Sequence, residues 1–347
     1  MATFYNVTIQ KIIKETADAV SIVFDVPASL KETFSFRAGQ YLTLKKEIGG
    51  EEVRRAYSIC ASPNSNELKV AIKAVENGVF STHATTQLHE GDVLEVAPPE
   101  GKFIIDPQAD KKYIGFAAGS GITPVLAMIK QVLEDEPSAS FTLVYGNKTA
   151  QTTIFKNELD ALATRYASQF NLHYLYSREA DNGSKLGRID KAHTLHVVTE
   201  LHRNSSFDAA FLCGPEAMIN TVSDTLKDKG FDEENIHFEL FTASTTAVAL
   251  DIPEGKTLIT VLLDDEETTF TMSKTDDILA ASLRNDLDAP YSCQGGVCSS
   301  CLGKVIEGKA VMSKNSILTD DEIEEGFVLT CQAHPTTAKL VLDFDDV

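Results

Sequence analysis

Four cysteines near the C-terminus have the spacing of a metal-cluster site. Cys293, Cys298 and Cys301 form a C-x4-C-x2-C run, and Cys331 follows thirty residues later. This is the plant-type spacing for a two-iron, two-sulfide cluster, which four thiolates hold. A structural zinc site is the alternative, but zinc sites usually use two short paired cysteine knuckles. We therefore predict a 2Fe-2S cluster on these four cysteines.

The other two cysteines, Cys60 and Cys213, lie in apolar strand-like runs, so their context predicts buried and inert thiols. Clustering of the other four favours metal ligation in a reducing compartment over a disulfide framework. The N-terminus lacks a basic region followed by an apolar stretch, and no apolar run approaches 18 residues. We therefore expect a cytoplasmic protein without membrane insertion.

A glycine-containing segment, Gly119-Ser120-Gly121-Ile122-Thr123-Pro124, lies between an expected strand and an expected helix. A helix N-terminus presents free N–H groups and partial positive charge to a diphosphate. Proline fits the first helical turn because no donor is lost there. The segment departs from G-x-G-x-x-G, so by itself it fits a nucleotide loop and an ordinary strand-to-helix turn equally well.

Ser177 and Arg178 follow a later strand. A hydroxyl beside a guanidinium suits the 2′-phosphate of NADPH, whereas NAD sites usually carry an acidic residue at this place. Arg55, Tyr57 and Ser58 combine a phosphate-binding cation, a ring that can stack on a flavin and a hydroxyl that can reach a flavin nitrogen. Taken alone, each of these sets is also compatible with ordinary surface or strand residues.

Three blocks of secondary structure must position these residues. Short apolar runs separated by glycines, with one short helical stretch at 81–88, favour an antiparallel barrel or sandwich. Alternating strands and helices then favour a parallel doubly wound sheet. Two strands and a helix at 276–286, capped by Thr275 or Asp276, follow a linker. The expected parts are an antiparallel β-barrel at 1–107, an α/β domain at 108–242, a linker at 243–255 and an α+β, β-grasp-like domain at 256–347.

The charge of the chain excludes one class of partner. The 347 residues carry 31 Lys plus Arg against 51 Asp plus Glu, a net charge of −20. Such a surface repels DNA, RNA and anionic lipid, because phosphate binding needs excess cations. Residues 255–347 alone hold 17 acidic and 7 basic residues, which suits either docking to a basic partner surface or simply keeping the protein in solution.

Together these motifs resemble the ferredoxin–NADP reductase superfamily along the whole chain. The matching segments are Arg55-Ala56-Tyr57-Ser58 for R-x-Y-S, Gly78-Val79-Phe80-Ser81-Thr82 for G-x-x-S/T, Gly119 to Pro124 for G-x-G-x-T-P, and Cys213-Gly214-Pro215 for C-G-P. With a ferredoxin module at the C-terminus, the chain looks like a reductase component of a bacterial multicomponent oxygenase. Within that family it is most similar to the phenylacetyl-CoA epoxidase reductases, which share Tyr145-Gly146-Asn147-Lys148, and the 3-ketosteroid 9α-hydroxylase reductases are near neighbours.

The resemblance implies a bound FAD in the barrel domain. Arg55 would hold the flavin diphosphate, Tyr57 would pack on the isoalloxazine ring and Ser58 would approach its reactive nitrogen. Ser81 and Thr82 would donate hydrogen bonds to the diphosphate. These roles make 1–107 the FAD-binding domain.

It also implies an NADP(H)-binding domain at 108–242. Gly119, Gly121 and Thr123 would cradle NADPH, and Ser177 with Arg178 would read its 2′-phosphate. Many family members carry arginine where Lys148 stands in this chain, and lysine supplies the positive charge only as a point.

Three residues are expected to touch the reacting groups. They are Ser58, Cys213 beside the nicotinamide, and Phe241, which would shield the flavin ring. NADPH gives up two electrons as one hydride while an iron–sulfur cluster takes one electron at a time, so a flavin between them resolves the mismatch.

The implied activity is electron transfer from NADPH through FAD and the 2Fe-2S cluster to a terminal oxygenase, with phenylacetyl-CoA epoxidase expected as the partner. Another oxygenase, such as a ketosteroid hydroxylase, and a general ferredoxin-type role are the alternatives. A non-catalytic iron–sulfur sensor is a further alternative, but the intact Arg55, Tyr57 and Ser58 argue against it.

Overall fold

The structure, a computed structural model, describes residues 3–179, 185–202, 206–241 and 255–347. Contacts divide the chain into a larger unit, Tyr5–Phe241, and a second unit, called the C-terminal unit below, whose described residues are 3–4 and 255–347. Apart from Gly255, the predicted linker at 243–255 and the Thr242 before it lie outside the described residues. The boundary at 107/108 falls inside the larger unit and stays a prediction.

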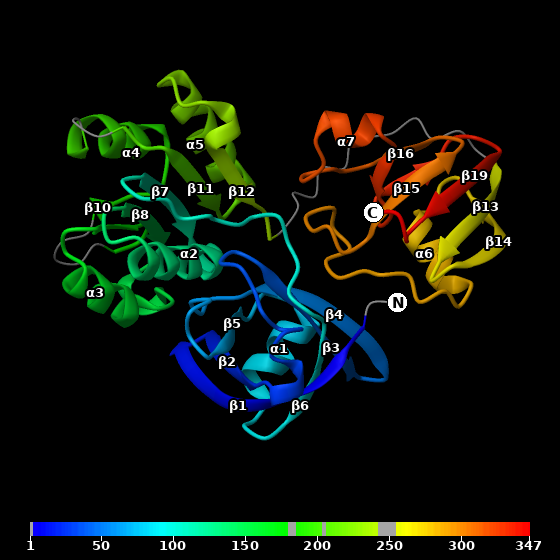
Figure 1. The fold of residues 1–347 in the computed structure, drawn as a ribbon, viewed down its shortest axis with the longest axis horizontal. Helices are drawn as coiled ribbons and strands as arrows, with labels where there is room; N and C mark the ends of the chain where they lie inside the picture. Colours follow the sequence, from blue (N-terminus) through cyan, green and yellow to red (C-terminus); the bar gives the residue numbers. More distant parts are fainter. Residues whose placement is uncertain (1–2, 180–184, 203–205, 242–254) are drawn as a thin grey trace. The chain divides into compact units, whose positions relative to one another are not determined.

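A six-stranded antiparallel sheet forms the first half of the larger unit, in the order β4-β3-β6-β1-β2-β5 (Figure 1). Ile59 pairs with Val70, and the Cys60 N–H donates to Lys69 O at 2.9 Å, so the two outer strands meet and close a barrel. The elements are β1 (Tyr5–Thr16), β2 (Ala19–Asp25), η1 (Ala28–Leu30), β3 (Tyr41–Ile48), β4 (Glu51–Ser58), β5 (Leu68–Lys73), α1 (Val79–Thr86) and β6 (Val93–Val96). The predicted antiparallel barrel is confirmed, and its helix begins two residues earlier than expected.

A six-stranded parallel sheet forms the second half, in the order β10-β9-β8-β7-β11-β12. The strands are β7 (Lys112–Ala118), β8 (Ser140–Asn147), β9 (Phe170–Tyr176), β10 (Lys185–Leu186), β11 (Ala209–Cys213) and β12 (Ile236–Glu239). The strand order reverses between β7 and β11. Ligands of such sheets bind outside the carboxyl ends of the strands at this reversal.

Helices cover both faces of the parallel sheet, as the predicted doubly wound fold requires (Figure 1). Helices α2 and α3 lie on one face, and α4 and α5 on the other. Helix α2 is buried along most of its length, which follows from its apolar sequence. The bounds are η2 (Gly119–Gly121), α2 (Ile122–Asp135), η3 (Ala150–Thr152), α3 (Lys156–Arg165), α4 (Lys191–Leu195), η4 (His196–Leu201), α5 (Glu216–Asp228) and η5 (Glu233–Asn235).

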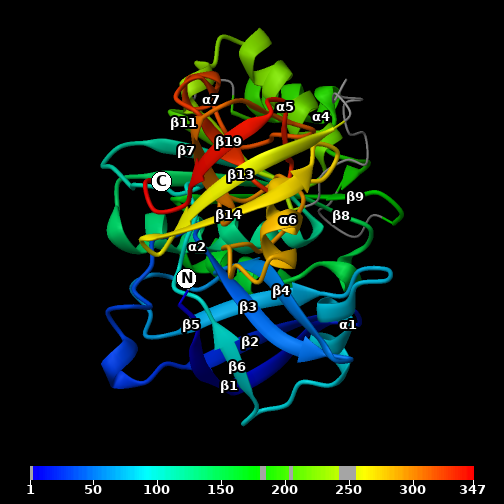
Figure 2. The same cartoon turned by 90° about the vertical axis from the view of Figure 1, so that its right-hand side faces the viewer.

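The C-terminal unit is an α+β domain with a five-stranded mixed sheet in the order β14-β13-β19-β15-β17 and a small β16-β18 pair. Helix α6 lies beside this sheet (Figure 2). Its Ile278 and Leu279 belong to the same hydrophobic core as Ile259 and Val261 of β13. The elements are β13 (Lys256–Leu263), β14 (Glu266–Ser273), α6 (Ile278–Arg284), β15 (Leu302–Glu307), β16 (Ala310–Met312), α7 (Asp320–Glu324), β17 (Phe327–Leu329), β18 (Ala333–Pro335) and β19 (Lys339–Asp343).

The expected cap of the helix at 276–286, Thr275 or Asp276, was wrong by one or two residues. Asp277 is the N-cap, because its carboxylate accepts a hydrogen bond from the Ala280 N–H at 2.7 Å. Asp276 instead forms an ion pair with Arg284 at 2.5 Å. Among the described residues, no helix is both long and apolar enough to cross a bilayer.

Candidate functional site

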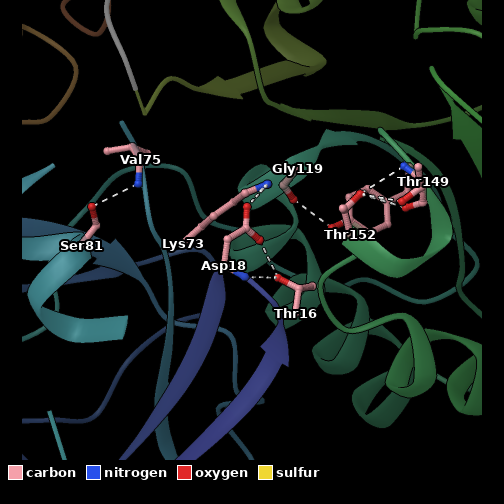
Figure 3. Close-up of polar contacts among 9 residues, drawn as sticks. Thr16, Asp18, Lys73, Val75, Ser81, Gly119, Thr149 and Thr152 are labelled. Carbon is pink, nitrogen blue, oxygen red and sulfur yellow. Dashed lines mark hydrogen bonds and ion pairs between the residues drawn. The ribbon is translucent and has the colours of Figure 1, made fainter. Parts of the chain in front are cut away.

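The glycine segment forms a turn at the carboxyl end of β7. Gly119 has φ of +58°, a left-handed conformation that glycine adopts without strain, and its carbonyl accepts from the Tyr145 hydroxyl at 2.9 Å (Figure 3). At Gly121 a Cβ would lie 2.1 Å from the Cys213 carbonyl oxygen, so no side chain fits. The structure thus brings the predicted nucleotide loop directly against the Cys213-Gly214 segment and points the N-terminus of α2 at the sheet edge.

A carboxylate that the sequence reasoning did not single out lies beside Cys213. Glu239 ends β12 and is the register partner of Cys213 at the end of β11. The Ser58 hydroxyl, at the end of β4, donates to Glu239 Oε2 at 3.1 Å. Three strand ends from both halves of the larger unit therefore meet at Ser58, Cys213 and Glu239.

Burial governs the protonation of this group. It raises the pKa of the Glu239 carboxyl to about 8, although the hydrogen bond from Ser58 acts in the opposite direction. Burial also raises the pKa of the Cys213 thiol well above its ordinary value, and Glu239 adds to that shift. Cys213 is therefore a neutral thiol, as predicted, while Glu239 holds a proton at neutral pH. In the sequence, Glu239 is marked only by being a single carboxylate among the apolar residues Phe238, Leu240 and Phe241.

Of the predicted flavin residues of β4, Arg55 and Tyr57 lie on one face of the strand and Ser58 lies on the other. Arg55 and Tyr57 are two residues apart and share one face; Arg55 is exposed, and the Tyr57 ring lies 5.6 Å from the Phe80 ring. Arg54, by contrast, is buried and pairs with Glu52 at 2.7 Å. Arg55 is thus the arginine of this strand that can reach a ligand phosphate.

Ser81 and Thr82 lie in the first turn of α1. The Val75 N–H donates to the buried Ser81 hydroxyl oxygen at 3.2 Å, which closes the loop before the helix (Figure 3). A Cβ at Gly78 would lie 2.3 Å from that oxygen, so glycine is required for this close approach. Thr82 is exposed. The loop and the helix N-terminus offer N–H and O–H donors of the kind that a diphosphate needs.

Lys73 is a second residue that the sequence reasoning missed. It ends β5, which lies against η2, and Figure 3 shows its side chain on the side of Gly119. Asp18 accepts from the Thr16 hydroxyl at 2.7 Å and lies 3.7 Å from the Lys73 amine. The barrel thus offers a cation beside the nucleotide loop. In the sequence, Lys73 is marked only by its place directly after the apolar run of β5.

The predicted 2′-phosphate residues follow β9 at the same carboxyl edge of the sheet. The N–H groups of Ser177 and Arg178 donate to the carbonyls of Asn147 and Lys148 at 2.9 and 3.0 Å. Arg178 is exposed, so its guanidinium is accessible. The predicted shield, Phe241, follows β12 and is 39% exposed.

The four cluster cysteines form two close pairs in the C-terminal unit. Cys293 and Cys298 Sγ atoms lie 3.0 Å apart, and the side chains of Cys301 and Cys331 are hydrogen-bonded to each other. Within the described ranges, no three His, Cys, Asp or Glu side chains converge on one ion. Two pairs suit two irons, each taking two thiolates, better than they suit a single zinc ion.

Backbone donors surround these sulfur atoms. The hydrogen bond from Cys298 lowers the pKa of the Cys293 thiol to about 6, and N–H groups of Gly295 and Val297 add to the effect. Gln294 and Gly296 have φ of +51° and +69°, which turns the loop around the sulfur atoms. These donors therefore favour the thiolate of Cys293, the form that binds iron.

Comparison with known families agrees with these sites. Residues 6–105 match an oxidoreductase FAD-binding domain, 116–224 match an oxidoreductase NAD-binding domain, and 261–336 match a 2Fe-2S iron-sulfur cluster binding domain. The chain thus carries domains for FAD, a pyridine nucleotide and a 2Fe-2S cluster in the predicted order.

Relatives match over almost the whole chain. The chain is 42% identical to one of the subunits of 1,2-phenylacetyl-CoA epoxidase from Escherichia coli strain K12, over 99% of both proteins. It is 33% identical to the 3-ketosteroid-9-alpha-monooxygenase ferredoxin reductase component of Rhodococcus rhodochrous, over 97% of this chain and 96% of the relative. Among solved structures, phthalate dioxygenase reductase superimposes with a TM-score of 0.64 at 26% identity, over 98% of both chains.

Replacing Glu239 with glutamine should flatten the pH dependence of stability. The folded-state pKa of this carboxyl, about 8, lies above its ordinary 4.5, so the folded protein binds the proton more tightly. Its contribution to the free energy of unfolding is therefore full below pH 4.5 and falls as the pH rises toward 8, by up to about 1.4 kcal/mol per unit. Denaturant unfolding of both proteins between pH 5 and 8 checks this, and equal slopes would contradict it.

Proposed function

This chain belongs to the flavin and iron–sulfur reductase components of multicomponent oxygenases, and we propose that it takes electrons from NADPH and delivers them one at a time to a phenylacetyl-CoA epoxidase. When bound, FAD accepts the two electrons of a hydride and the 2Fe-2S cluster accepts single electrons. The observation that carries the proposal is the meeting of Ser58, Cys213 and Glu239 beside the glycine loop at the sheet reversal.

The barrel residues would hold the flavin. Arg55 would pair with its diphosphate, and the donors of Ser81 and Thr82 would complete that contact. Tyr57 would pack on the ring, with Phe241 as its cover. Ser58 would then bring its hydroxyl to the reactive ring nitrogen, where the buried segment around it excludes water.

The parallel sheet would hold the nucleotide. Gly119, Gly121 and Thr123 would cradle the diphosphate at the N-terminus of α2, and Lys73 would add a cation from the barrel. Arg178, with Ser177, would bind the 2′-phosphate and so prefer NADPH to NADH. Cys213 would leave room for the nicotinamide beside Ser58.

Glu239 would serve as a proton store for this centre. Its carboxyl is protonated at neutral pH because of burial, and the Ser58 hydroxyl, which donates to its Oε2, would have to turn and accept for that proton to pass along the contact. The chain itself thus positions the reactants and holds one proton, while Cys293, Cys298, Cys301 and Cys331 would hold the cluster.

Arg178→Ala should raise the KM for NADPH about tenfold to a hundredfold and leave that for NADH within about twofold, because a charge-assisted phosphate contact contributes roughly 1.5–3 kcal/mol. Steady-state kinetics with both nucleotides measure this. Arg165→Ala, at another exposed arginine of the sheet domain, is the matched control. Equal changes for the two nucleotides would mean that the 2′-phosphate is bound elsewhere.

Cys298→Ser should abolish the cluster and stop electrons at the flavin. We expect loss of bound iron and of cytochrome c reduction, with flavin bleaching by NADPH retained, because the cysteines and the nucleotide site lie in separate units. Iron analysis and anaerobic absorption spectra check both points. Loss of flavin bleaching would refute this order of the electron carriers.

The exposed acidic residues of α7 are proposed to dock the oxygenase. Changing Asp320, Asp321, Glu324 and Glu325 to amides should slow reduction of the epoxidase and weaken its salt dependence, with ferricyanide reduction unchanged. Glu322 is spared because it forms a capping box with Thr319. The same change at Glu233 and Glu234 is the control. Equal losses with both acceptors would rule out a docking role, and faster reduction of a ketosteroid hydroxylase would reassign the partner.

A further inference from the structure

A cluster of charges lies between the barrel and the parallel sheet, away from the residues assigned above. Glu158, in the first turn of α3, lies 2.6 Å from the Lys130 amine and 3.6 Å from the Lys69 amine. Lys69 belongs to β5 of the barrel and Lys130 to α2. Their side chains are only 9% and 11% exposed, so one carboxylate joins two buried cations from the two halves of the larger unit.

Lys130 makes a second contact across the same boundary. Its amine donates to the carbonyl oxygen of Cys60 at 3.0 Å, two residues beyond Ser58. Farther along α2, the side chains of Glu134 and Asp135 accept from Ser62 and Asn64 of the same barrel segment. The second half of the helix that begins at the nucleotide loop is therefore bonded to the segment that follows the flavin strand.

The start of α3 is held in an unusual conformation at this place. Phe155 is buried and has φ of +60° and ψ of +20°, a region that a bulky side chain rarely adopts. The Lys69 amine lies 5.3 Å from the centre of its ring. The turn at Phe155 directs the start of α3 so that Glu158 reaches the two lysines. Because Phe155 packs under Lys69, this packing holds both the strained turn and the ion pairs of Glu158.

The cluster is close to neutral in charge. Glu15, at the end of β1, is partly buried, interacts with both lysines and with Glu158, and accepts from Ser21. The exposed Glu67 also interacts with Lys69, so two lysines face three carboxylates. Glu158 is the carboxylate that lies 3.6 Å and 2.6 Å from the two buried lysine amines, so its loss would weaken the contact that joins the two halves at this boundary.

We propose that Glu158, together with Lys130 and Lys69, is a positioning bridge that sets the distance between the nucleotide loop and the flavin strand, and hence the rate of hydride transfer. The inference rests on the proposed function, since it assigns the bridge to that reaction. Hydride transfer needs near contact of donor and acceptor, and a misplacement of about 1 Å can cost about a hundredfold in rate. Ser177 and Arg178 lie within the sheet domain, so binding of the adenosine end would not depend on the bridge.

The test compares Glu158→Gln and Lys130→Met with the wild-type protein. We expect the rate of anaerobic flavin bleaching at saturating NADPH to fall about tenfold to a hundredfold, with the nucleotide Kd within about twofold. Independently of activity, amide hydrogen exchange in residues 60–64 should become faster. Lys191→Met removes the exposed Lys191–Asp228 pair between α4 and α5, and as the matched control it should change neither quantity.

The variant Glu158→Asp distinguishes an effect of the carboxylate charge from an effect of side-chain packing. It keeps the carboxylate, so it should recover at least part of the rate that Glu158→Gln loses, and equal rates for both variants would overturn the proposal. So would rates and exchange indistinguishable from those of Lys191→Met. If wild-type flavin is not bleached by NADPH or NADH, the proposed function fails instead; hydrogen exchange then still decides whether the bridge joins the two halves.

Discussion

The close approach of Gly121 to the carbonyl of Cys213 is the contact on which the site depends. A Cβ at Gly121 would lie 2.1 Å from that oxygen, so the backbone of α2 can meet the end of β11 only where no side chain stands between them. The contact places the helix N-terminus between the ends of β7 and β11, where the strand order of the sheet reverses. The nucleotide contacts proposed for the parallel-sheet half, from Gly119 to Arg178, are arranged along this carboxyl edge.

The barrel must be brought to that edge for a flavin to meet a nucleotide. The hydrogen bond from Ser58 to Glu239 does so at the centre, and the bridge of Lys69, Glu158 and Lys130 does so at the boundary behind it. The Ser58–Glu239 contact lies at the proposed reaction site, whereas the lysine–glutamate bridge is proposed only to position the two halves. The C-terminal unit supplies its cluster site from its own loop and strands, so the iron ligands do not depend on either contact.

Features set by local sequence could be predicted, and features set by tertiary contact could not. The cysteine spacing, the glycine loop and the strand periodicities are local, and the helices predicted at 81–88 and 276–286 begin and end within two residues of the expected positions. Glu239 acts with Ser58, which lies 181 residues earlier, and Lys73 matters because β5 packs against η2. The cap of α6, Asp277, was not predicted because three consecutive residues, Thr275 to Asp277, all have side chains that can cap a helix.

The most direct test is a rapid-mixing experiment in which anaerobic wild-type protein, carrying flavin and cluster, is mixed with stoichiometric NADPH and followed by its full absorption spectrum. The account predicts that the flavin bands bleach first and that the iron–sulfur absorption then falls as single electrons pass to the cluster. Intact flavin bands in the presence of NADPH, with both chromophores bound, would contradict it, because the site at Ser58, Cys213 and Glu239 would then not join nucleotide to flavin.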